Sequence, residues 1–239
     1  MKLLAYIAGA GLLLQLGCNP DPGEIEQQVG YRTLLDEGPT SGERGSVRIS
    51  EVLWSGSVSN DGHWNAGDGF VEVRNEGTRP INLSGWFLEF TGALEKTVRF
   101  PTSDRVLDVG EHAFMAVRAT ACFPNPDWVA ADLEIPLGDP MRITLRDADE
   151  RLIDSAGDKK NPPMSGGYDL VVSRSMERLE LMFGQSGSSP QMWKFYVEAE
   201  TDVPNNDRVL SACRQRTLAS PGRANSPDYS GAYASGGFE

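Results

Sequence analysis

The alternation of apolar and polar residues predicts a series of short β-strands that starts near residue 46. Apolar and polar residues alternate along residues 47–52, and a similar alternation returns in residues 70–75 and 81–90. A period of two is typical of a strand with one buried face. We therefore expect these three segments to form strands that pack one face against a core.

Weaker strand patterns fill most of the chain between residues 97 and 198. Turn-forming residues separate them at 108–110, 137–140 and 147–149, and no segment between them has a clear helical period. Many short strands at near-regular spacing predict an all-β antiparallel sandwich or barrel. The further predicted strands are residues 97–100, 105–107, 112–117, 133–135, 141–146, 151–155, 169–172, 177–183 and 194–198.

The N-terminus has a different pattern, that of a secretory signal. Lys2 precedes an uncharged apolar run over residues 3–16, which is shorter than the ~20 residues that span a bilayer. The small Gly17 before Cys18 predicts cleavage there and lipid attachment to Cys18, as in bacterial lipoproteins. Those proteins usually carry Leu where this chain has Gln15, so an ordinary signal peptide with a chance cysteine is the alternative.

These patterns divide the chain into a signal, a tether, a folded domain and a tail. Residues 1–17 form the predicted lipoprotein signal peptide, and residues 18–45 are polar and contain several prolines, as in a flexible tether. Residues 46–226 form the predicted β-domain. Residues 227–239 are small and polar with scattered aromatics, and we expect a disordered C-terminal tail.

Composition narrows the class of partner. The formal net charge of −12 disfavours nucleic acid, because binding to phosphates depends on cationic side chains. The same charge disfavours attachment to anionic lipid by electrostatics alone. We therefore expect no nucleic-acid partner, and membrane contact only through an N-terminal lipid.

The three cysteines fit an exported protein with one disulfide. If lipid is attached to Cys18, then Cys122 and Cys213 remain, and the simplest interpretation is that they form a disulfide. Two separate buried thiols are the alternative. A loop of this length would gain ~4–5 kcal/mol from the bond in the chain-entropy model.

The polar loop at residues 59–69 is the best candidate for a cation site. Asn60, Asp61, Asn65 and Asp68 offer the oxygen ligands that calcium prefers, although their spacing is not that of an EF-hand. The alternative is a turn-rich loop in which Asn and Asp cap their own backbone. Apart from this weak calcium candidate, we expect no cofactor.

Candidate catalytic residues are few. His63 and His112 are the only histidines, and no nucleophile elbow accompanies them, so a Ser-His-Asp triad is not predicted. Pairs of Asp or Glu could still support hydrolysis with a metal, but no spacing selects a pair. Trp64 and Trp128 lie in loops, where they either bind a partner or cover the core.

Several segments together resemble the lamin-tail domain. Residues 69–75 (Gly-Phe-Val-Glu-Val-Arg-Asn) and 83–88 (Leu-Ser-Gly-Trp-Phe-Leu) are similar to its core signature. Further segments resemble bacterial members in order and spacing, so that the resemblance covers residues 46–226. They are residues 109–112, 151–154, 175–178, Trp193 and 220–225.

The resemblance implies an immunoglobulin-like β-sandwich with an interaction role and no catalytic residues. Residues 118–132, 156–168 and 199–216 are longer than in a minimal member, and a Cys122–Cys213 bond would join two of these insertions. We expect a lipid-anchored protein of the bacterial cell envelope, at the outer membrane or cell surface. It would bind another envelope protein or a surface polysaccharide. The alternative is a metal-assisted hydrolase of the cell envelope that uses acidic residues.

Overall fold

A computed structural model describes residues 42–118, 122–179, 186–197 and 206–228. All of them belong to the compact unit of residues 32–239. They contain no α-helix, only a short 3-10 turn at Pro190–Met192, and no described helix is long and apolar enough to cross a membrane. The all-β prediction is confirmed.

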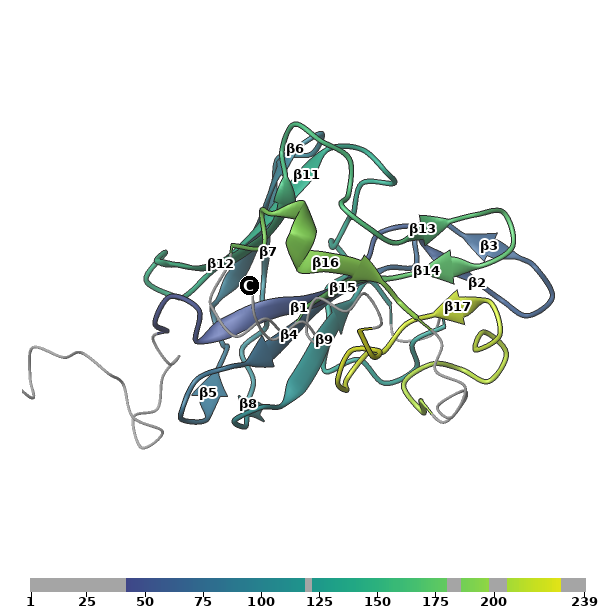
Figure 1. The fold of residues 1–239 in the computed structure, drawn as a ribbon. Helices are drawn as coiled ribbons and strands as arrows, with labels where there is room; N and C mark the ends of the chain where they lie inside the picture. The colour runs from purple at the N-terminus through teal and green to yellow at the C-terminus, as the bar shows by residue number, and fades with distance from the viewer. Residues whose placement is uncertain (1–41, 119–121, 180–185, 198–205, 229–239) are drawn as a thin grey trace, which may run out of the picture. The chain divides into compact units, whose positions relative to one another are not determined.

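Two sheets form the main body of this unit. The larger sheet has the strand order β10-β9-β4-β1-β15-β16 and is antiparallel except for the β10–β9 pair (Figure 1). Its strands are β1 (Val47–Leu53), β4 (Phe70–Asn75), β9 (His112–Ala116), β10 (Trp128–Val129), β15 (Met176–Arg178) and β16 (Trp193–Phe195).

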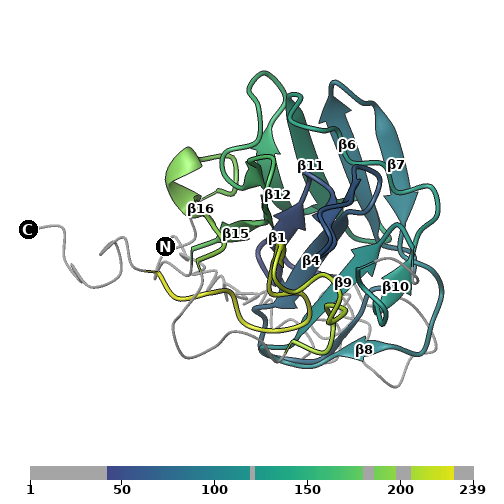
Figure 2. The same cartoon turned by 90° about the vertical axis from the view of Figure 1, so that its right-hand side faces the viewer.

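The smaller of the two main sheets is antiparallel and has the order β12-β11-β6-β7. Figure 2 shows β6, β7 and β11 as one group of strands and β1, β4 and β9 as another. The strands are β6 (Phe87–Gly92), β7 (Lys96–Arg99), β11 (Met141–Arg146) and β12 (Leu152–Asp158). The result is the immunoglobulin-like β-sandwich expected from the sequence.

The core lies between these two sheets. Ile49 and Val73 of the larger sheet and Leu88 and Ile143 of the smaller one belong to one buried apolar cluster. Trp86 is fully buried in the same cluster, directly after Gly85, whose φ of +78° closes a tight turn that few other residues adopt. The alternating residues of β1 and β4 thus meet those of β6 and β11.

Short strand pairs complete the structure. One group comprises β2 (Ser57–Val58) with β3 (Trp64–Asn65), and β13 (Gly167–Tyr168) with β14 (Ser173–Arg174) and β17 (Thr217–Leu218). Figure 1 shows this group together at the right-hand side, and we call it the loop end. A separate pair, β5 (Ile81–Asn82) with β8 (Val106–Leu107), lies apart from it.

Some strand predictions need correction. Residues 133–135 form no strand, and residues 169–172 form the turn between β13 and β14, where Asp169 accepts hydrogen bonds from the backbone N–H groups of Val171 and Val172. The predicted strand 81–90 is broken into β5 and β6 at the turn that contains Gly85. Residues 180–183 of the predicted strand 177–183 lie outside the described residues, as does residue 198 of the strand predicted over 194–198.

The outer face of the larger sheet is also covered. Leu53, Phe70 and Phe114 point to this side and pack in a second apolar cluster with Phe123 and Val209. Residues 217–226, which we call the closing segment, cross the same face at β1, β4 and β15. The larger sheet is therefore buried on both sides over most of its area.

Candidate functional site

Three buried glutamates lie side by side on the outer face of the larger sheet. Glu51 of β1 is the register partner of Glu72 on β4 and of Glu177 on β15, and all three are fully buried. The closing segment covers them. Ser220 donates its backbone N–H to Glu51 at 2.9 Å, and Gly222 donates its N–H to Glu72 at 2.6 Å.

Basic side chains contact the two outer glutamates of this row. His112 Nδ1 is 2.7 Å from Glu72 Oε1, and Lys194 Nζ contacts Glu177 Oε2. Glu51 in the middle has hydroxyl and amide donors instead. Burial, followed by the charges of Glu72 and Glu177, raises the pKa of Glu51 well above its usual range.

The pKa of Glu72 is also raised, chiefly by burial, and partly offset by hydrogen bonds from Ser50 and Gly222. A perturbed carboxyl group often marks an active site, but only where it lines a cleft. Here the closing segment occupies the place where a substrate would have to bind. The glutamate row therefore holds the C-terminal part of the domain, and it is not a hydrolytic site.

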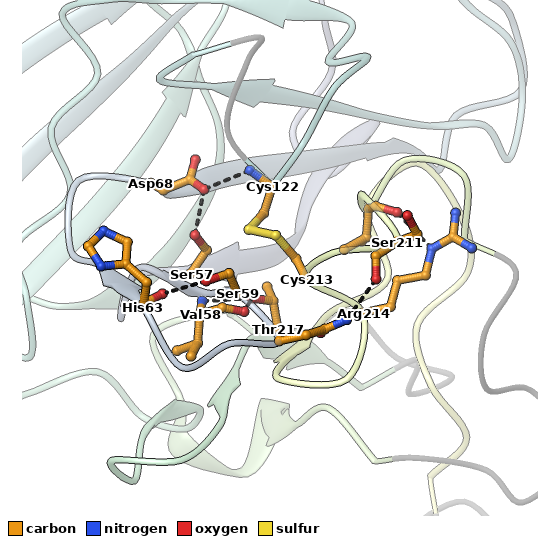
Figure 3. Close-up of a disulfide and its surroundings, with 12 residues drawn as sticks. Ser57, Val58, Ser59, His63, Asp68, Cys122, Ser211, Cys213, Arg214 and Thr217 are labelled. Carbon is orange, nitrogen blue, oxygen red and sulfur yellow. Dashed lines mark hydrogen bonds between the residues drawn. A yellow bond between two sulfur atoms is a disulfide. The ribbon is translucent and has the colours of Figure 1, made fainter.

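The predicted disulfide is present. Cys122 and Cys213 are bonded, with 5.8 Å between their Cα atoms, a usual separation for a disulfide. Figure 3 shows Asp68 next to it, where one carboxylate oxygen accepts hydrogen bonds from Ser57 Oγ at 2.6 Å and from the Cys122 N–H at 3.0 Å. The bond joins two of the predicted insertions and fixes them over the second apolar cluster.

All four side chains proposed for calcium make hydrogen bonds within the protein, although Asp68 Oδ1 is buried without a hydrogen-bond partner among the described residues. Asn60 bonds to the backbone of Ser211 and Gln215, Asn65 accepts from Arg118, and Asp61 accepts from the N–H of His63. Hydrogen bonds from the Ser59 hydroxyl and from the His63 N–H lower the pKa of Asp61. Burial raises the pKa of Asp68. Within residues 42–228, as far as described, no three His, Cys, Asp or Glu side chains form a metal-binding group.

Asn60, Asp61 and Asp68 therefore bond to backbone groups, as in the alternative interpretation of the loop, whereas Asn65 accepts from the Arg118 side chain. Asn60 in particular ties the β2–β3 hairpin to residues 211–215. Neither histidine forms part of a catalytic triad. His112 is buried against Glu72, and His63 is exposed at the hairpin turn, where its carbonyl oxygen accepts from the Ser59 N–H at 3.0 Å.

The loop end exposes a group of apolar side chains. Trp64 is 40% exposed and stacks on Tyr168 with 5.1 Å between ring centroids, and Leu170 and Val171 at the tip of the next hairpin are 83% and 55% exposed. We call these four residues the apolar tip. Trp128 is not part of it, because it is 5% exposed and packs edge-on against Phe100 in the core.

The backbone at the tip is strained. Leu170 has a φ of +74°, a conformation that costs a residue with a β-carbon about 1–2 kcal/mol. Its side chain is 83% exposed, so burial of apolar surface does little to offset this cost. Asp169 holds the turn through its two backbone bonds, which also lower the pKa of its carboxyl group. The fold thus displays a leucine in solvent at an energetic cost.

A groove of about 620 Å³ lies next to the loop end. Its walls include Trp54, Ile135 and Leu137, and the ion pair of Lys96 with Glu134 crosses its rim at 3.7 Å. Trp54 also reaches the apolar tip's hairpin, since its indole N–H donates to the Ser165 carbonyl at 2.8 Å. The groove and the apolar tip are therefore parts of one end of the sandwich.

A covered sheet, a closed carboxyl cluster and exposed apolar loops define an immunoglobulin-like interaction module. The family model described as Lamin Tail Domain matches residues 40–160, which is half of the chain. This chain belongs to the lamin tail domain family, whose members are interaction modules without cofactors. No curated protein matches the chain.

The family match ends after β12, while the larger sheet continues in β15 and β16. Glu177, the third member of the glutamate row, lies on β15. The matched residues 40–160 contain only Glu51 and Glu72, so they could not indicate the whole row. Cys18, the signal peptide and most of the predicted tether lie outside the described residues.

Proposed function

We propose that this chain is a lipid-anchored module of the bacterial cell envelope that binds another envelope protein through its loop end. Cys18 would carry the lipid, and residues 19–45 would separate the domain from the membrane. The domain's family supports an interaction role. The observation that carries the choice of surface is Leu170, a strained and 83% exposed apolar residue.

A protein partner fits this surface better than a polysaccharide does. Tyr168 already covers one face of the Trp64 ring, so the ring is less open to a sugar than a free tryptophan would be. Leu170 and Val171 offer no hydrogen bonds to hydroxyl groups. Exposed aliphatic and aromatic side chains beside a groove are typical of the centre of a protein interface.

The surface is tested by a matched pair of substitutions. Val171 and Val109 are both 55% exposed, but Val109 lies in the turn between β8 and β9, away from the loop end. Val171→Ser should reduce the partner recovered from membranes in mild detergent by about tenfold, while Val109→Ser should not. Equal recovery with both variants would exclude the apolar tip as the binding surface.

The anchor is tested separately. Mass spectrometry of the mature N-terminal peptide should find Cys18 carrying lipid, and Cys18→Ala should move the protein out of the membrane fraction. An unmodified Cys18 thiol would refute the anchor without affecting the binding surface, because the two experiments use different parts of the chain.

A further inference from the structure

Four arginines gather near the start of β1, on a chain whose net charge is −12. Arg44 precedes β1, Arg48 lies in it, Arg74 is on β4, and Arg178 ends β15. We call them the arginine cluster. Arg48 and Arg74 lie on the outer side of the larger sheet beside the glutamate row, and Arg48, Arg74 and Arg178 line a common hollow with Glu76 and His112.

The register of the sheet places two of these charges opposite each other. Arg48 is the direct partner of Arg74 in the β1–β4 pair, and like charges at such positions destabilise a sheet. Arg74 is paired with Glu76 at 3.2 Å. The Arg48 side chain makes no hydrogen bond or ion pair with any residue that the structure describes. Its charge is therefore not balanced by this chain's described residues.

The guanidinium of Arg178 is held in place by several contacts. It is 5% exposed, its Nη1 contacts Asp154 and the Ile49 carbonyl, and its guanidinium carbon lies 5.7 Å from the Trp193 ring centroid. Asp154 is also held by the Ile49 N–H at 2.9 Å. Both charged groups are thus kept in place by backbone and by each other.

A second, larger hollow of about 300 Å³ lies next to Arg178. Arg44, Arg48 and Arg178 line it together with Ser155, and Asp154 is the one carboxylate in the lining. Three arginines against one aspartate leave the hollow positively charged. Arginine forks match the paired oxygens of carboxylate, sulfate and phosphate groups, and Ser155 adds a neutral hydroxyl to the lining.

We propose that this hollow is an oxyanion-binding site in which Arg48 and Arg44 bind one carboxylate, sulfate or phosphate group against the fixed guanidinium of Arg178. A bound anion would balance the charge of Arg48, which no described residue balances and which faces Arg74 across the strand pair. The group belongs either to a free inorganic anion or to an acidic sugar. The site is independent of the apolar tip, so the proposed function and this proposal can fail separately.

Isothermal titration of the full-length protein in a neutral detergent tests the proposal. Sodium sulfate, sodium phosphate and sodium glucuronate are titrated at constant ionic strength, because screening weakens exposed charge pairs. We expect saturable binding of one anion, weakened at least about tenfold by Arg48→Gln and by Arg44→Gln. Arg99→Gln is the control, since Arg99 is an exposed arginine on β7 of the other sheet.

Tighter binding of glucuronate than of sulfate or phosphate would identify an acidic sugar as the source, and the reverse order would identify a free inorganic anion. Absence of saturable binding with all three probes would overturn the proposal. An equal loss of affinity in Arg99→Gln would do so as well, because it would indicate a general charge effect.

Thermal unfolding separates binding from folding. Without anion, Arg48→Gln should melt at or above the temperature of the wild type, because the repulsion from Arg74 is removed. With the tightest anion, the melting temperature should rise in the wild type and in Arg99→Gln but not in Arg48→Gln. An Arg48→Gln variant that melts lower without anion, and gains the same rise on anion addition, would show that Arg48 is a structural residue only.

Discussion

Replacing Glu51 by glutamine tests how the glutamate row holds the domain together. The substitution keeps the size of the side chain and removes the charge at the centre of the row. The glutamine oxygen can still accept the Ser220 N–H that Glu51 accepts at 2.9 Å. The closing segment should therefore stay in place while the cost of burying a third carboxylate disappears.

The sign of the pH effect follows from the raised pKa values. Burial raises the pKa of both Glu51 and Glu72 above the ordinary value of 4.5. Between that value and the folded-state pKa, the folded protein binds a proton that the unfolded chain has released. The stabilisation is fully present below pH 4.5 and is lost as the pH rises through the folded-state pKa.

The change in the free energy of unfolding with pH depends on how many extra protons the folded protein binds. One such group lowers the free energy of unfolding by about 1.4 kcal/mol for each pH unit in this window, and two groups lower it by about 2.7 kcal/mol. Glu51→Gln removes one of them. The stability of the variant relative to wild type should therefore increase by about 1.4 kcal/mol per pH unit from mildly acidic pH upward.

Urea unfolding at successive pH values measures this slope. Glu95→Gln is the control, because Glu95 is exposed in the turn between β6 and β7 and should leave the slope unchanged. If wild type and Glu51→Gln have parallel pH profiles, then Glu51 does not hold an extra proton in the folded state and the reasoning is refuted.

A second variant separates charge from hydrogen bonding. Glu51→Ala leaves the Ser220 N–H buried without its acceptor. The Ser220 hydroxyl can still donate its hydrogen bond of 2.6 Å to Glu177. The missing acceptor should cost about 1–3 kcal/mol relative to Glu51→Gln at every pH. Equal stability of the alanine and glutamine variants would mean that the closing segment does not depend on this bond.

Further predictions concern the disulfide, the core and the apolar tip. Replacing Cys122 and Cys213 by serine should lower the free energy of unfolding by ~2–5 kcal/mol, and an unchanged urea midpoint would contradict a stabilising role. Trp86→Ala should cost about 3–5 kcal/mol because Trp86 is fully buried, whereas Trp64→Ala should cost clearly less; similar midpoints for the two would contradict the core assignment. Leu170→Gly should raise the midpoint by relieving the positive φ while weakening partner binding, and a lower midpoint would show that the leucine packs in the fold.

The strands that face the core could be predicted from the sequence because their period is a direct result of burial on one side. Residues 47–52 and 70–75 alternate clearly, and β1 and β4 start at the predicted residues. The same reasoning failed for the loop end. The β2–β3 hairpin is held by distant contacts, such as the bond of 2.8 Å from the Val58 N–H to Thr217 Oγ1, which leave no periodic pattern.

The glutamate row could not be predicted for a related reason. Glu72 stands on the polar face of an alternating strand, and the register shift between Ile49 and Glu51 turns Glu51 to the same face. Such a face is usually in contact with water. Here a segment about 150 or more residues away in the sequence covers that face, as the Gly222–Glu72 bond shows. The predicted link between Cys122 and Cys213 indicated that two insertions meet, but it gave no information on what they cover.

The arginine cluster differs from the rest of the larger sheet's outer face in how it is covered. The far end of this face, around Phe70 and Phe114, is apolar and is covered by the segments that the disulfide joins. The middle of the face, the glutamate row, is covered by the closing segment, whose N–H and hydroxyl groups match carboxylates. The chain thus covers two zones of one face with chemically matched partners. In the third zone Arg74 pairs with Glu76, but the described residues supply no partner for the charge of Arg48. An unbalanced Arg48, on a face otherwise closed by complementary groups, agrees with the proposed binding of an anion that comes from outside the chain.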